Sequence, residues 1–124
     1  MQVLKFKSPS LNSELERAHP VIKDLIVDVL SLWPSAVVIT SVEREPGEAG
    51  VMGAMSPHVA RPCRGVDIRT RDVAPDDVEY VAKILNNRWK YDPTRPHLRV
   101  AVVEGDHLHI QVHDNTIFNR IETA

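Results

Sequence analysis

The sequence has a single cysteine, Cys63, and no long run of apolar residues. One cysteine cannot form an intrachain disulfide, so the fold makes no demand on an oxidising compartment. No stretch of about 18 apolar residues is available to span a bilayer, and residues 1–7 carry no apolar run of signal-peptide length. We therefore expect a protein that is made in the cytoplasm without a signal peptide and does not contact a membrane.

Blocks of one charge are missing as well. Lysine and arginine number 15 against 17 aspartates and glutamates, a formal net charge of −2 with histidine neutral. Without a Lys/Arg block, nucleic acid is not an expected partner. The 124 residues, 43% of them hydrophobic, suffice for one domain with a buried core. We assign residues 1–124 to that single domain and expect a monomer.

Apolar residues at helical spacing predict three helices. The first begins after a loop over residues 8–13, with Ser13 as its N-cap. Pro20 either kinks this helix or begins a second one, which continues to Trp33. The third opens at residues 74–77 with a proline and two acids, and continues towards residue 89.

Short β-branched runs predict strands over residues 36–42 and 65–69, separated by a glycine-bearing polar loop over residues 43–55. A hairpin follows, with strands over 98–103 and 107–113 around a turn at 104–106. This order of elements indicates an α+β fold in which helices pack on one side of a mostly antiparallel sheet.

Histidines 107, 109 and 113 alternate on one face of the last predicted strand, opposite an apolar face. That pattern is either a solvated strand face or the wall of a cleft. His109, at mid-strand, has the rigidity that a metal ligand needs. His107 is a candidate for a second ligand or for an auxiliary proton donor. Asp106 lies in the turn, where the alternation of the strand does not fix its direction.

His58 and Asp67 are the other candidate residues. His58 follows the glycine-bearing loop, and Asp67 lies between two apolar strand residues. A carboxylate there needs solvent or a partner, because an unpaired buried charge is costly, and neighbouring arginines offer an ordinary salt bridge. Two histidines and one carboxylate form the three-ligand set of catalytic zinc, and a spare carboxylate can act as general base.

Four motifs in this order resemble the family of zinc D-Ala-D-Ala carboxypeptidases and L-alanyl-D-glutamate endopeptidases, which includes phage endolysins and shares its core with the hedgehog signalling domain. In chain order, the motifs are the strand that leads to Arg44, then Ser56-Pro57-His58, Arg64-Gly65-Val66-Asp67 and Asp106-His107-Leu108-His109. The resemblance covers roughly residues 20–113.

This resemblance implies a hedgehog-type peptidase fold and a role for each motif residue. His58, Asp67 and His109 would bind Zn²⁺, and Asp106 would act as base, with His107 as the competing candidate. Arg44 would contact a substrate carboxylate or the developing oxyanion, and Ser56 would lie beside it in substrate binding. His58 and Asp67 are nine residues apart, whereas the family usually has seven. Residues 61–63 look like the extra material, with Cys63 kept as a free thiol.

The function that this resemblance implies is a metallopeptidase hydrolysing peptidoglycan stem peptides, as a carboxypeptidase or an endolysin-type endopeptidase in cell wall degradation. Such a protein would reach the cell wall after release, or be delivered there by another factor. Two alternatives stay open. One is a metal-dependent nuclease built on the same histidines, against which the lack of a basic patch argues. The other is a non-catalytic phage structural or binding domain that retains the peptidase fold.

Overall fold

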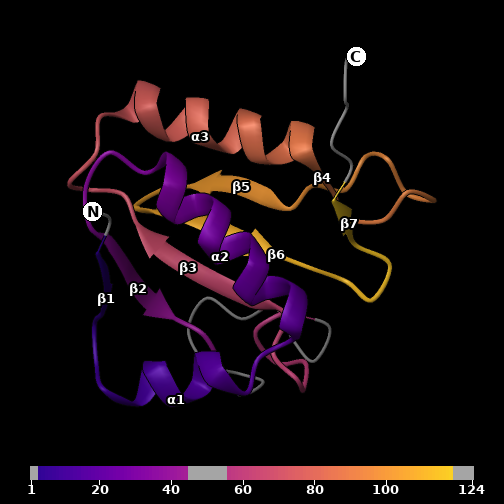
Figure 1. The fold of residues 1–124 in the computed structure, drawn as a ribbon, viewed down its shortest axis with the longest axis horizontal. Helices are drawn as coiled ribbons and strands as arrows, with labels where there is room; N and C mark the ends of the chain where they lie inside the picture. The colour runs from indigo at the N-terminus through magenta and orange to yellow at the C-terminus, as the bar shows by residue number, and fades with distance from the viewer. Residues whose placement is uncertain (1–2, 45–55, 119–124) are drawn as a thin grey trace.

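A computed structural model describes residues 3–44 and 56–118, and these residues form an α+β fold (Figure 1). Five strands form one sheet in the order β1-β2-β3-β6-β5, in which β1 runs parallel to β2 and the other neighbouring pairs are antiparallel. These strands are β1 (Leu4–Phe6), β2 (Val37–Ser41), β3 (Gly65–Arg69), β5 (Ala101–Glu104) and β6 (His107–Gln111). The prediction of a mostly antiparallel sheet with helices is confirmed.

Three helices and a small second sheet complete the described structure. The helices are α1 (Ser10–Glu16), α2 (Pro20–Leu32) and α3 (Pro75–Arg88), and the second sheet pairs β4 (Trp89–Lys90) with β7 (Ile117–Phe118). No helix among the described residues is both long and apolar enough to cross a membrane. Of the polar loop predicted over residues 43–55, positions 45–55 lie outside the described residues.

Pro20 begins a new helix, which was one of the two predicted outcomes. It occupies the first turn of α2, where its missing N–H costs no hydrogen bond. The Nδ1 atom of His19 accepts a hydrogen bond from the backbone N–H of Val21 and caps this end. The helix ends at Leu32, one residue before the predicted end, and Trp33 is its extended C-cap residue.

The first helix begins earlier than predicted. Ser13 is not its N-cap, because α1 starts at Ser10 and the N–H of Leu11 already bonds to the carbonyl of Ser8. Leu11 and Leu15 are both buried, one helical turn apart. A start at Ser10 brings both leucines onto the core, and this burial outweighs the capping preference of a serine.

The terminal hairpin is shorter than predicted. Residues 98–100 are not part of β5, and a hydrogen bond from the N–H of Leu98 to the carbonyl of Arg95 closes a turn there. Strand β6 ends at Gln111, so His113 does not share the strand face of the other two histidines. Its Nδ1 instead accepts a hydrogen bond from the N–H of Asn115.

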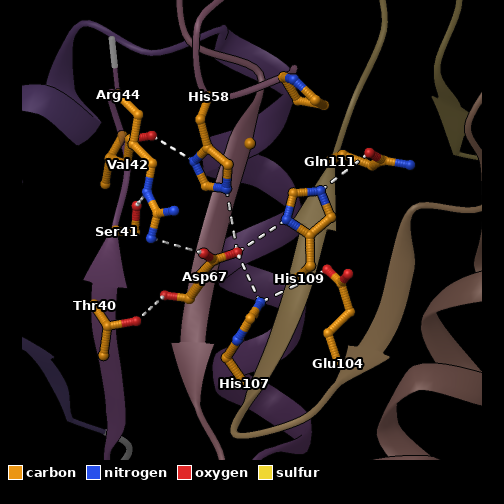
Figure 2. A network of polar contacts seen from close by, with 12 residues as sticks. Thr40, Ser41, Val42, Arg44, His58, Asp67, Glu104, His107, His109 and Gln111 are labelled. Atoms are coloured by element: carbon orange, nitrogen blue, oxygen red, sulfur yellow. Dashed lines mark hydrogen bonds and ion pairs between the residues drawn. The ribbon is translucent and has the colours of Figure 1, made fainter. Parts of the chain in front are cut away.

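The central strands separate an apolar from a polar face of the sheet. Val66 and Ile68 on β3, with Leu108 and Ile110 on β6, are fully buried in a core that includes the apolar face of α2. Asp67 alternates with these residues and is paired in register with His109 of β6. The side chains of Asp67, His107 and His109 thus project from the face opposite α2 (Figure 2).

Candidate metal centre

Three side chains from separate segments meet on the polar face of the sheet (Figure 2). Asp67 of β3 places its Oδ1 atom 3.2 Å from Nε2 of His58 and 2.9 Å from Nδ1 of His109. The potential ligand atoms of the three residues all lie within 4.8 Å of one another. His58 and Asp67 are 5% and 4% exposed, so the group is largely shielded from water. These are the same three residues for which the family resemblance implied zinc binding.

The ring of His58 is oriented by a backbone carbonyl. Its Nδ1 atom lies 2.6 Å from the carbonyl oxygen of Val42, at the end of β2. A carbonyl can only accept a hydrogen bond, so Nδ1 carries the proton and donates it. In the neutral ring, Nε2 is then unprotonated and directs its lone pair towards Asp67. Metal-binding histidines are usually held in this way by an outer hydrogen bond.

The ring of His109 is oriented through a longer chain of contacts. The side-chain nitrogen of Gln111 donates to the carbonyl of Arg99 over 2.8 Å, which fixes the direction of the amide. Oε1 of Gln111 is therefore the atom that faces Nε2 of His109, at 3.1 Å. The proton of the neutral ring belongs on Nε2, and Nδ1 presents its lone pair to Asp67.

These orientations leave two nitrogen lone pairs and a carboxylate oxygen facing one another. Three acceptors repel unless a positive charge lies among them, and that charge is either a proton on a histidine or a metal ion. Two imidazole nitrogens and one carboxylate oxygen are ligands that Zn²⁺ accepts, and catalytic zinc sites use three protein ligands. The donor set, its burial and its outer hydrogen bonds therefore fit a zinc ion.

The pKa values of Asp67 and His109 are set by burial on one side and by their mutual interactions on the other. Burial alone would raise the pKa of Asp67, but its polar and charge interactions with His109 and His58 hold it well below the usual range of a carboxyl. Burial would lower the pKa of His109, but its hydrogen bond and charge interaction with Asp67 raise it. A metal ion would compete with a proton for these ligand atoms.

The turn that carries His58 fits closely against β3. Ser56 accepts a hydrogen bond from the N–H of His58 and starts the turn. A Cβ atom at Gly65 would lie 3.0 Å from Cβ of Pro57 and 3.3 Å from Cε1 of His109. The absence of a side chain at Gly65 thus allows both histidine-bearing segments to approach the strand.

The nine-residue spacing between His58 and Asp67 is accommodated by a closed turn. One guanidinium nitrogen of Arg61 donates to the carbonyls of residues 58, 59 and 60, at 2.9 to 3.0 Å. Cys63 is buried, and its Sγ donates to the carbonyls of Val42 and Gly65. Burial raises the pKa of this thiol, and it does not belong to the candidate metal-binding group of His58, Asp67 and His109.

Arg44 lies at the edge of the same group. Its Nε donates to Oγ of Ser41 over 2.7 Å, and its guanidinium lies 3.7 Å from Oδ2 of Asp67. The backbone N–H of Arg44 bonds to the carbonyl of His58, which joins the end of β2 to the ligand-bearing turn. The arginine is therefore held beside the carboxylate oxygen that faces away from the histidines.

His107 connects Asp106 to the group. Its Nδ1 lies 3.0 Å from Oδ1 of Asp106, and its Nε2 lies 3.7 Å from Oδ1 of Asp67. The side chain of Asp106 is 96% exposed, and the hydrogen bond with His107 lowers its pKa. Asp106 therefore lies one residue removed from the three ligands, with His107 between them.

Glu104 was not among the predicted site residues. It ends β5 rather than forming part of the turn, pairs in register with His107, and places Oε1 3.6 Å from Nε2 of that histidine. The signal in the sequence was the glycine at position 105, because glycine is preferred at the first position of a two-residue hairpin turn. Its φ in the structure is +46°. A turn of Gly105 and Asp106 puts Glu104 opposite His107.

An open cavity of about 420 Å³ borders the three candidate ligands. Arg44, Ser56, Glu104 and His107 line it together with the metal-binding group. Asp106 lines a neighbouring cavity instead. The first cavity has the size of a small-ligand pocket and gives a substrate access to the ligands. Comparisons with protein-family models, with curated proteins and with solved structures each found no match.

Proposed function

We propose that the chain is a zinc-dependent peptidase that cleaves peptidoglycan stem peptides. The observation that supports this most is the convergence of His58, Asp67 and His109 with their lone pairs turned inward. The peptide substrate rests on the resemblance of the four motifs to the D-Ala-D-Ala carboxypeptidase and endolysin family. The hedgehog-type fold is part of the same proposal, and the mostly antiparallel sheet agrees with it.

His58, Asp67 and His109 would hold the zinc ion. Bound there, zinc would act as a Lewis acid and lower the pKa of a water molecule from ~15.7 towards ~7. The imidazole N–H groups donate hydrogen bonds to the carbonyl of Val42 and to Oε1 of Gln111, and these bonds keep the two rings in the required orientation. Ligands fixed in this way need little rearrangement when a substrate arrives.

Proton transfer is assigned to the pair formed by Asp106 and His107. Asp106 accepts a hydrogen bond from the Nδ1–H of His107, so Nε2 of the neutral ring has a free lone pair that faces the group. His107 takes a proton from water at Nε2 and passes it to the leaving amine. Asp106 orients the ring and stabilises its charged form. Glu104, beside Nε2, is a second acceptor at the same position.

Arg44 is assigned to the substrate. Its guanidinium borders the cavity beside Asp67 and presents a planar set of donors. Such a fork suits a carboxylate or the oxyanion that forms during peptide hydrolysis. Ser56 lines the same cavity and is assigned as a further substrate contact.

The test combines metal analysis with a cell-wall assay. Wild-type protein should contain one zinc per chain and release peptides from purified peptidoglycan. His109→Ala should lose both properties, while His113→Ala, a histidine outside the group, should keep both. Zinc retained by His109→Ala would refute the ligand assignment. Zinc binding without peptide release would favour the non-catalytic alternative, and cleavage of plasmid DNA in parallel would favour a nuclease.

A further inference from the structure

A second cavity adjoins the one that borders the metal-binding group. It has a volume of about 560 Å³ and shares Arg44, Asp67 and His107 with the first. This volume is within the range of pockets that bind small molecules. A substrate lying over the ligands can therefore extend into the second cavity past Arg44.

The charges around this second cavity are unequal. Two carboxylates line it, and both are engaged: Asp67 with the histidines of the group, and Asp106 with His107. Four cationic side chains line it as well, and two of these are engaged, since Arg69 pairs with Asp72 and Arg44 with Asp67.

The other two cations are Lys7 and Arg71. Within residues 3–44 and 56–118, neither side chain has a hydrogen-bond or ion-pair partner. Both residues are exposed; Lys7 directly follows β1, and Arg71 lies two residues after the end of β3. The backbone N–H of Lys7 bonds to Ile39, and that of Thr70 bonds to Asp106, so the chain beside each cation is fixed.

From this arrangement we infer that the second cavity is a subsite for a carboxylate of the peptide substrate, held by Lys7 and Arg71. The inference rests on the proposed peptidase function and adds a preference for acidic peptides. Arginine and lysine form charge-assisted hydrogen bonds with carboxylates. A nucleic acid fits less well, because it would need a run of cations along its phosphates, whereas the chain carries a net charge of −2.

The experiment measures binding rather than turnover. The intact protein, with its zinc content determined, is titrated with three single-residue probes and followed by amide chemical shifts in NMR spectra. N-acetylglutamate α-amide carries a side-chain carboxylate, N-acetylglutamine carries a chain-end carboxylate, and N-acetylglutamine amide carries neither. Comparing the first two shows which kind of carboxylate the cavity takes, and the third reports binding without charge.

Arg71→Gln and Lys7→Gln are the test variants, and Lys90→Gln, an exposed lysine of β4 outside this cavity, is the matched control. Each test variant should weaken binding of the preferred carboxylate probe about threefold to tenfold, the range of a partly exposed charge contact. Binding of the uncharged probe, zinc content and the control should not change. Equal weakening of charged and uncharged probes, or by the control, would overturn the inference, as would no effect of either variant.

An octamer of deoxythymidine provides a further arm. If it binds more tightly than both carboxylate probes and loses affinity in the same two variants, the cavity is a nucleic-acid contact and the inference is wrong. The two proposals can also fail separately. A protein without peptidase activity whose carboxylate binding depends on both cations would retain the subsite and lose the proposed function. An active peptidase whose carboxylate binding is unaffected would do the reverse.

Discussion

Nε2 of His109 lies 3.1 Å from Oε1 of Gln111, and the amide of Gln111 is itself fixed by the carbonyl of Arg99. This chain of contacts determines which nitrogen of His109 faces Asp67. We predict that Gln111→Ala weakens zinc binding about 10-fold to 100-fold, the usual effect of removing an outer partner of a metal ligand. Competition with a fluorescent zinc chelator measures the change.

The matched control for this prediction is His113→Ala. His113 follows β6, and its ring lies against Tyr91 rather than against the metal-binding group. Its replacement should leave the zinc affinity unchanged. Equal affinities for Gln111→Ala and wild type would mean that the glutamine does not orient the ligand.

Arg44→Lys tests whether the planar fork at the edge of the group matters. Lysine keeps the charge but cannot make two parallel hydrogen bonds to a carboxylate. We expect release of peptide from peptidoglycan to fall by at least about 10-fold, while the zinc content stays at the wild-type level. Arg88→Lys, which alters an ion pair between α3 and Asp28 of α2, is the control. Full activity in Arg44→Ala would remove this arginine from the mechanism.

Gly65→Ala tests the close approach of the two ligand-bearing segments. The added methyl group would meet the ring of Pro57 at 3.0 Å and His109 at 3.3 Å. Neither a proline ring nor a ring held at both nitrogens moves easily, so we expect a loss of about 1–3 kcal/mol in the free energy of unfolding. Zinc affinity should fall as well, because His109 is displaced.

Gly105→Ala provides the comparison for this change. Its backbone has a φ of +46°, and nothing lies within 4 Å of an added Cβ. The substitution should cost roughly 1–2 kcal/mol through backbone strain alone and leave the zinc affinity intact. If the two alanine variants lose zinc affinity equally, contact with the ligands is not the reason for glycine at position 65.

Asp92 gives a prediction about pH that is independent of the metal. It is 3% exposed and accepts hydrogen bonds from Thr94 and Arg95, and these bonds hold the pKa of its carboxyl well below the ordinary value. A carboxyl with a lower pKa in the folded state stabilises the fold above its unfolded pKa, ~3.9, and loses that contribution as the pH falls below it.

Wild type should therefore exceed Asp92→Asn in the free energy of unfolding at pH 7, and the difference should shrink below roughly pH 4. Urea unfolding over a series of pH values measures both proteins. Asp24→Asn on α2 controls for the loss of one negative charge. A difference that is constant down to pH 3 would show that the hydrogen bonds of Asp92 do not depend on its charge.

The sequence predicted the parts of the fold whose signals are strong and local. Apolar positions at helical spacing identified α2, and alternation around Asp67 identified β3. It did not predict β1, β4 and β7, which have three residues or fewer and depend on partners distant in sequence. Local pattern reasoning cannot identify such strands, because pairing rather than propensity forms them.

The sequence likewise predicted some residues of the candidate site and missed others. His58, Asp67 and His109 were predicted from motif order, and they do converge, although the zinc ion itself stays a prediction. Glu104 and Gln111 were missed because their roles depend on the register of the hairpin and on the direction of an amide. Those features arise only when the strands are paired.

The last prediction separates Asp106 from His107 as the proton acceptor. Asp106 matches the base of the family motif, yet its carboxylate contacts Nδ1 of His107, and only His107 directs a nitrogen towards Asp67. His107→Ala should therefore lower the rate of peptide release on the order of 10²–10⁴, the contribution of a positioned proton acceptor. Variants at His107 and at Asp106 should both retain zinc, since neither residue is a proposed ligand.

Asp106→Asn should have a smaller effect than His107→Ala if the carboxylate only orients the ring. The amide of asparagine still offers an acceptor oxygen to Nδ1, but it cannot stabilise the charged imidazole. Glu104→Gln, measured in parallel, tests the remaining acceptor. If His107→Ala turns over normally while Asp106→Ala is inactive with zinc bound, the base is the carboxylate and the histidine is a bystander.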